Sequence, residues 1–146
     1  MTITCTRRLQ WCMGHRVMGH ENKCGHLHGH NYVGYFTAEA LDLDTCGRVI
    51  DFSVLKACIG KWIDETWDHG FIYSIDDRAV SAMVNTFVAS NGEPQKTHAM
   101  PYNPTAENIA KYLLHTIFPT MFLGTGITIT KVEIQETENC SAICEL

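Results

Sequence analysis

The 146-residue sequence contains no run of about 18 apolar residues, the minimum for a membrane-spanning helix. Its first ten residues, MTITCTRRLQ, lack the apolar stretch and the small-residue cleavage site of a signal peptide. It has no cluster of Lys and Arg, and its formal net charge is −5. Because phosphate contacts need clustered cations, nucleic acid is not expected as the main partner. These absences predict a soluble, cytoplasmic protein without a membrane partner.

Closely paired cysteines are missing as well. Seven cysteines are an odd number for a disulfide framework, and no two of them have CxxC spacing. We therefore expect mostly reduced thiols. With 45% hydrophobic residues, a chain of this length can bury one core, so residues 1–146 are expected to form a single domain.

Hydrophobic periodicity predicts an α+β fold whose elements follow the order ββααββ. Alternation over residues 3–13 and a β-branched, aromatic stretch at 31–41 predict two strands. Residues 126–137 predict a third strand, with a bulge near Lys131 where the apolar phase shifts, and 141–146 predict a fourth. We expect an antiparallel sheet with two helices on one face. If the other face is apolar, oligomerisation is the simplest way to cover it.

Two amphipathic helices are predicted between the strand pairs. The first starts with Ser53 as a possible N-cap, and the second starts near Asn103 and ends at Pro119. Residues 76–103 fit neither period, so they predict an irregular loop with a small helix within 77–87.

Histidines are concentrated in the segment KCGHLHGHNY, residues 23–32. Along an extended strand residues two apart share a face, so His28 and His30 can both reach one ion. His15, at the end of the first strand, can add a third ligand if the first two strands pair. His26 has the same parity as His28 and is a rival ligand that spacing does not exclude.

Two other interpretations of this segment remain open. The histidines could be surface or capping residues, or they could form half of a zinc finger. A finger would need two thiolates close together, and Cys24 is the only cysteine in the segment.

Several motifs together resemble the 6-pyruvoyl-tetrahydropterin synthase superfamily. GHRV, KCGHLHGHNY, GRVIDFSVLK, WDH, NPTAEN and IQET occur in its order and approximate spacing. The short spacer before KC is most similar to the bacterial and phage branch, the 6-carboxytetrahydropterin synthases of 7-deazaguanine (queuosine) biosynthesis. The likeness covers nearly the whole chain except roughly 76–101. It departs at WCMGHR, where many members read FSAAHR, and in the extended 76–103 region.

The resemblance implies a tunnelling fold (T-fold), whose trimers close a barrel and often pair into hexamers. It implies Zn²⁺ as cofactor, with His15, His28 and His30 as ligands and His26 as a bystander. Three histidines leave the fourth position of the ion open to substrate, the arrangement of a catalytic site.

The resemblance also implies roles for four further side chains. Cys24 matches the general base, and a thiol near a dication loses its proton more readily than a free cysteine. Asp68 and His69 match a proton relay, and Glu136 matches the pterin anchor, since a carboxylate can accept two parallel N–H bonds.

Each of these residues also has an ordinary structural explanation. Taken alone, Cys24 could be an inert buried thiol, Asp68–His69 a capping pair, and Glu136 a strand-end charge. Thr105 and Glu107 lie in the PTxEN motif as substrate-binding candidates, and Glu107 could equally interact with a helix N-terminus.

The implied reaction converts 7,8-dihydroneopterin triphosphate to 6-carboxy-5,6,7,8-tetrahydropterin with loss of triphosphate and acetaldehyde. A second possibility stops at the 6-pyruvoyl product. A third is a non-catalytic zinc-binding or pterin-binding protein on the same scaffold. The presence of Cys24 disfavours release of 6-hydroxymethyl-dihydropterin, because members with that outcome usually carry Glu there.

Overall fold

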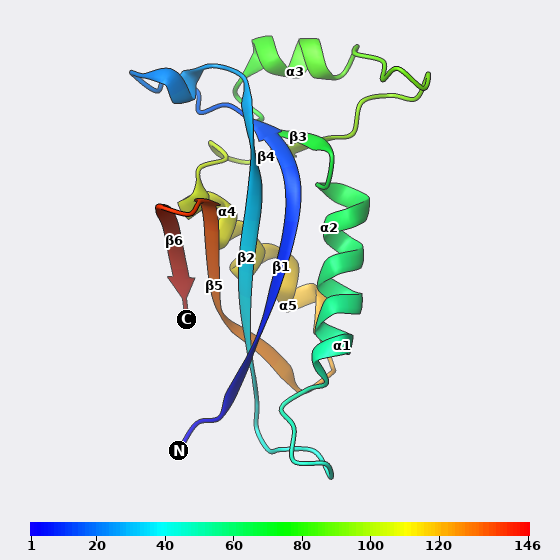
Figure 1. Cartoon of the computed structure of the whole chain (residues 1–146), viewed down its shortest axis with the longest axis vertical. Helices are drawn as coiled ribbons and strands as arrows, with labels where there is room; N and C mark the ends of the chain where they lie inside the picture. Colours follow the sequence, from blue (N-terminus) through cyan, green and yellow to red (C-terminus); the bar gives the residue numbers. More distant parts are fainter.

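The computed structural model describes residues 1–146 as a curved sheet with helices against one face (Figure 1). Six strands follow the spatial order β4-β3-β1-β2-β5-β6. The strands are Thr4–His15 (β1), His28–Ala40 (β2), Gly70–Ser74 (β3), Thr97–Met100 (β4), Ile127–Thr137 (β5) and Cys140–Glu145 (β6). The helices are Phe52–Leu55 (α1), Lys61–Thr66 (α2), Arg78–Val84 (α3), Ala106–Tyr112 (α4) and Phe118–Met121 (α5), with a 3-10 turn at Lys23–Gly25 (η1) and π-turns at Lys56–Gly60 (η2) and Leu113–Ile117 (η3).

The four strands expected from the sequence form the antiparallel part of the sheet. β1 pairs with β2 along its full length, β2 pairs with β5, and β5 pairs with β6. In the β2–β5 ladder Thr37 lies opposite Lys131 and Ala38 opposite Ile129, which leaves Thr130 as an extra residue. The bulge predicted near Lys131 is therefore confirmed, and it explains the phase shift of the apolar residues.

Two further strands were not predicted, and the expectation of about four strands is wrong. β3 runs parallel to the end of β1 at Met13–His15, and β4 runs parallel to β3. Four of the five residues of β3 are buried, so the segment shows none of the alternation that marks a half-buried strand. The 76–103 segment is only partly irregular, since it holds β4 as well as α3, which confirms the small helix expected within 77–87.

The first predicted helix forms, but its cap differs from the prediction. α1, η2 and α2 follow one another directly from Phe52 to Thr66. The N-cap is Asp51, whose carboxylate accepts the backbone N–H of Ser53 at 2.8 Å, so Ser53 is inside the helix.

The second predicted helix also forms, with both ends displaced. Thr105, not Asn103, is the N-cap, and its hydroxyl accepts the backbone N–H of Asn108 at 3.2 Å. The helix does not end at Pro119 but continues to Met121. The π-turn η3 directly precedes α5, and Pro119 lies in the first turn of α5, where a residue without an N–H is tolerated.

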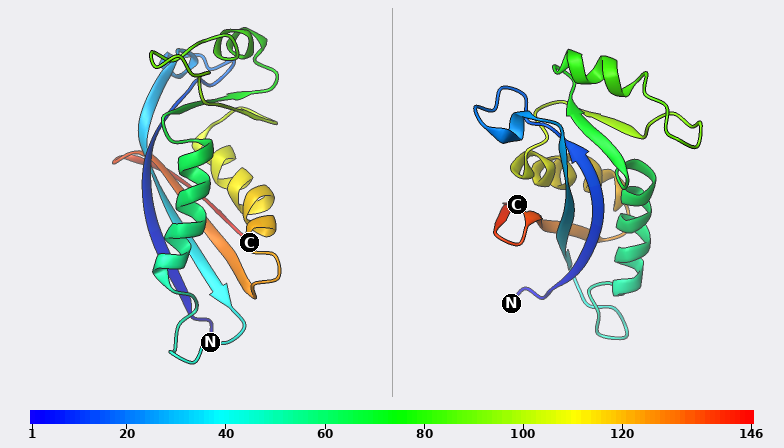
Figure 2. Two further views of the ribbon diagram at one scale, coloured as in Figure 1. Left: turned by 90° about the vertical axis from the view of Figure 1, so that its right-hand side faces the viewer. Right: turned by 45° about the horizontal axis from the view of Figure 1, so that its top comes forward.

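Both helices cover the same face of the sheet (Figure 2), and the core lies between them and the strands. Leu55, Ile59 and Ile63 from the first helix are buried. So are Ile109 and Leu113 from the second, which confirms the predicted apolar stripes. The sheet contributes Trp11, Met13, Tyr32, Phe36, Val132 and Ile134 to the same cluster. No helix in the structure has the length and apolar character needed to cross a bilayer.

The uncovered face of the sheet is mainly polar, with Thr6, Arg8 and Gln10 of β1 exposed upon it. The condition under which the sequence predicted oligomerisation, an apolar uncovered face, is therefore not met. The strand edges are open instead. β3 pairs with β1 only at Met13–His15, and β6 is the outermost strand at the other side of the sheet. Unpaired backbone groups along such edges favour pairing with another chain.

Candidate active site

Three histidine side chains converge at the end of the β1–β2 ladder. His15 lies directly opposite His28 in the register, and His30 lies two residues along the same strand face. One nitrogen from each imidazole can be chosen so that all three lie within 4.8 Å of one another. The predicted pairing of the first two strands is thus present, and it brings together the three residues expected to bind the metal.

Hydrogen bonds at the far side of two rings determine which nitrogen faces the centre. Nδ1–H of His15 donates to the carbonyl of Pro104 at 2.7 Å, and Nδ1–H of His28 donates to the carbonyl of His26 at 2.7 Å. Each ring therefore presents an unprotonated Nε2 in its neutral form. Such outer hydrogen bonds hold metal-binding imidazoles in the correct orientation.

The two Nε2 atoms of His15 and His28 are 3.0 Å apart. With both Nδ1 positions protonated, this contact joins two lone pairs, which repel unless a cation lies beside them. Nε2 of His30 is buried without a hydrogen-bond partner. A tetrahedral zinc ion bound at about 2.0–2.1 Å would need nitrogens roughly 3.3 Å apart, so the three residues fit this ion.

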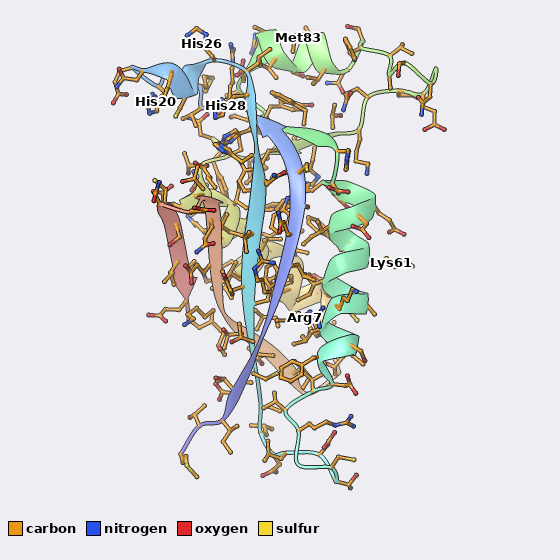
Figure 3. All side chains as sticks on the ribbon, viewed as in Figure 1. Arg7, His20, His26, His28, Lys61 and Met83 are labelled. Carbon is orange, nitrogen blue, oxygen red and sulfur yellow. The ribbon has the colours of Figure 1, made fainter.

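His26 does not belong to this cluster. Its side chain is exposed and projects from the upper end of the molecule, beyond His28 (Figure 3). Only its main-chain carbonyl takes part, as the acceptor for His28. The rival assignment that spacing left open is therefore not supported by the geometry.

A cavity of about 280 Å³ opens next to the histidines. His15, Cys24, Thr105, Glu107 and Glu136 line it. The structure thus brings together one candidate metal ligand, the candidate base and all three candidate substrate-binding residues, which come from separate parts of the chain.

Glu136 lines the cavity and lies close to two of the histidines. Its Oε1 is 3.9 Å from Nε2 of His15, and its Oε2 is 3.7 Å from Nε2 of His30. Burial raises the pKa of Glu136, with the charge of Glu107 adding to the effect and the nearby His28 opposing it. Burial also lowers the pKa of His15 to about 4 and, with His28, lowers that of His30. Both histidines are therefore neutral near pH 7, the form that binds metals.

Thr105 and Glu107 have local structural roles beside their place in the cavity. The hydroxyl of Thr105 caps α4, and Glu107 lies in the first turn of that helix, where a negative charge is favourable. Both interpretations of Glu107 therefore remain compatible with its position.

Asp68 and His69 lie apart from this cavity. His69 lines a second hollow together with Cys12, His30 and Asn31, and Cys24 does not line it. Nδ1 of His69 is 2.8 Å from Oδ2 of Asp68, so the pair has the hydrogen bond expected of a relay. Hydrogen bonds from the Cys12 N–H and from His69 outweigh the effect of burial and lower the pKa of Asp68. Within one chain, His69 and Cys24 therefore line different hollows.

Two parts of the site were not found from the sequence. His20 lines the cavity from the loop that carries η1, and Cys140 and Ser141 line it from the start of β6. The positions of these residues in the cavity depend on how the strands pair, and residue spacing along the chain does not predict that pairing. The contact of Cys12 with the Asp68–His69 pair was missed for the same reason.

Known proteins resemble this chain over nearly its whole length. The family model for 6-pyruvoyl tetrahydropterin synthase matches residues 4–146. A 6-carboxy-5,6,7,8-tetrahydropterin synthase from Rickettsia felis is 43% identical over 138 residues, covering 94% of this chain and 96% of the relative. The protein of the same name from Haemophilus influenzae is 31% identical over 144 residues, covering 96% and 95%.

Solved structures share the fold. An uncharacterized protein from Wolinella succinogenes superposes with a TM-score of 0.79 at 24% identity, covering 99% of this chain and 98% of the other. The 6-pyruvoyl tetrahydropterin synthase of Plasmodium falciparum superposes with a TM-score of 0.71 at 21% identity, with the same coverage. The predicted fold class is therefore confirmed, with two added strands.

Proposed function

Because the chain belongs to the 6-pyruvoyl tetrahydropterin synthase family, we propose that it is a 6-carboxytetrahydropterin synthase. It would convert 7,8-dihydroneopterin triphosphate and one water molecule to 6-carboxy-5,6,7,8-tetrahydropterin, triphosphate and acetaldehyde. The observation that carries this proposal is the single cavity in which His15 of the histidine cluster meets Cys24 and Glu136. The curated relatives that share this name support it.

His15, His28 and His30 would hold a zinc ion. When bound, zinc polarises oxygen atoms of the substrate and lowers the cost of removing a neighbouring proton. The chain's own contribution is to keep the three imidazoles neutral and oriented, through burial and through the carbonyls of Pro104 and His26.

Glu136 would orient the substrate. A pterin is a flat heterocycle, and a carboxylate can accept two parallel N–H bonds from its edge. The distances of 3.9 and 3.7 Å from Glu136 to two histidines would hold the bound ring next to the ion. Thr105 and Glu107, which also line the cavity, would contact the rest of the substrate.

Cys24 would remove a proton from the substrate side chain, and Asp68 with His69 would relay it. Since this pair lies outside the Cys24 cavity of its own chain, the relay would come from a neighbouring copy. The active site would then lie between subunits and be incomplete in a monomer.

The open strand edges support such an assembly. The β1 edge before Met13 and the outer edge of β6 are different surfaces at opposite sides of the sheet. Pairing one with the other is a head-to-tail contact, which closes into a ring when the rotation permits. We propose a trimer, or a hexamer made of two trimers.

Product analysis tests the proposed function. Zinc-loaded protein is incubated with 7,8-dihydroneopterin triphosphate, and the products are separated by mass spectrometry. The 6-carboxy product with acetaldehyde supports the proposal and a place in 7-deazaguanine (queuosine) biosynthesis. The 6-pyruvoyl product identifies the other activity named in this family. Binding without turnover identifies a non-catalytic pterin-binding protein.

A further inference from the structure

A second group of side chains that could hold a metal ion contains none of the three histidines, although His30 lines the same hollow as Cys12 and His69. Sγ of Cys12, a carboxylate oxygen of Asp68 and an imidazole nitrogen of His69 lie within 4.8 Å of one another. Cys12 is at the position where the sequence departs from its family by reading WCMGHR. Cys12, Asn31 and His69 line that hollow together.

Backbone contacts hold the three residues in this arrangement. The N–H of Cys12 donates to Oδ1 of Asp68 at 3.0 Å, and the N–H of His69 donates to the carbonyl of Cys12 at 2.8 Å. His69 is the only non-glycine residue with a positive φ, at 59°. A left-handed residue of this kind persists where surrounding contacts over-determine it, and such residues concentrate at functional sites.

The donor set matches a specific class of cation. Thiolate, imidazole and carboxylate are the three ligand types of protein zinc sites, and thiolate excludes Mg²⁺ and Ca²⁺ as preferred ions. Oδ1 of Asn31 lies 2.9 Å from Sγ of Cys12, so a fourth oxygen is at hand. Within one chain Cys12 and His69 are exposed, so their side chains can rotate to shorten the present separations to ligand distances.

We propose that Cys12, Asp68 and His69 form a second binding site for a borderline-soft divalent cation such as Zn²⁺ or Co²⁺. The site differs from the histidine cluster because it contains a thiolate. Occupation would also take the imidazole of His69 out of the proton relay, a consequence that rests on the proposed function.

Cobalt titration of the metal-free full-length protein tests the site without relying on turnover. The expected result is two Co²⁺ per chain, with a near-ultraviolet sulfur-to-cobalt charge-transfer band. Cys12→Ser should abolish that band and reduce the stoichiometry to one, and His69→Ala should weaken the second binding step by about 100-fold or more, since even outer-shell partners are worth about 10–100-fold. Cys58→Ser, which changes another exposed thiol, is the matched control and should leave both steps intact.

Cys24→Ser separates this site from a thiolate near the histidines. If that variant loses the band while Cys12→Ser keeps it, the thiolate ligand is Cys24 and the proposal is overturned. A wild-type protein that binds one Co²⁺ without a charge-transfer band overturns it equally. Either result leaves the proposed synthase activity to be judged by product analysis alone.

Discussion

Replacing His28 by alanine should remove the metal, whereas replacing His26 should not. His28 presents Nε2 to His15 at 3.0 Å, while His26 is exposed and contributes only its carbonyl, which alanine retains. The two substitutions remove the same side chain two residues apart, so each serves as the control for the other.

The size of the effect follows from linkage. At free zinc one hundred times the wild-type Kd, binding stabilises the folded state by about 2.7 kcal/mol. Loss of an outer-shell partner weakens metal binding by about 10–100-fold, so loss of a ligand should reach at least the upper end. A hundredfold weaker site at the same zinc concentration retains about 0.4 kcal/mol. The difference of about 2.3 kcal/mol corresponds to roughly 5–9 °C in Tm for a chain of this size.

The assay is thermal unfolding with and without zinc, together with metal content by elemental analysis. Wild type and His26→Ala should show the full zinc-dependent shift, and His28→Ala should lose most of it. A His26→Ala protein that loses its zinc shift, beside a His28→Ala protein that keeps it, would refute the ligand assignment and the tautomer argument beneath it.

Four further outcomes are expected. Steady-state kinetics should show that Cys24→Ala loses turnover by about 10²-fold or more while it keeps zinc and substrate binding, and that Cys24→Ser is nearly as inactive. If Cys24→Ala instead loses zinc in proportion to activity, the thiol is a metal ligand. Because burial raises the pKa of Glu136, KM should rise on acidification from a pH above the usual carboxyl range, and Glu136→Gln should show a high KM with no such dependence. In metal-free protein, the pKa of His15 is about 4, below its unfolded value of 6.5. The contribution of neutral His15 to the free energy of unfolding is therefore fully present above pH 6.5, and about 3 kcal/mol of it is lost as the pH falls to 4. Denaturant titrations should show this loss in wild type but not in His15→Gln. Light scattering at micromolar concentration should give a trimer or hexamer, and a monomer would contradict the assembly proposed from the open edges.

Local patterns were sufficient for the elements that are buried on one side only. The alternation of β1 and the stripes of the two long helices follow directly from periods of 2 and 3.6, because one face meets the core and the other meets water. Periodicity did not predict β3, because nearly all of its residues are buried and none alternate with exposed ones. It did not predict β4, because four residues are too few to show a period. Caps were misassigned by two residues, since Asp51 and Thr105 compete with equally suitable neighbours.

The surface that we expect to pair with another copy of the chain differs between the sequence prediction and the structure. An uncovered sheet face was expected to need a partner if it was apolar, and that face proved polar, with Thr6, Arg8 and Gln10 exposed. The open edges of β1 and β6 are the surfaces available for pairing instead. The sequence did not reveal them, because which strands lie at an edge depends on the strand order of the whole sheet.

The sequence by itself determined the chemistry available to this protein. Donor atoms at 28 and 30 share a face because strand geometry places residues two apart on one side, whatever the rest of the chain does. Only the tertiary structure decided which partners those atoms meet. It placed His15 opposite His28, Glu136 within 4 Å of both His15 and His30, and Asp68–His69 beside Cys12 instead of Cys24. Contacts between residues far apart in the chain are set by register, strand order and the packing of the core, and no local spacing contains that information.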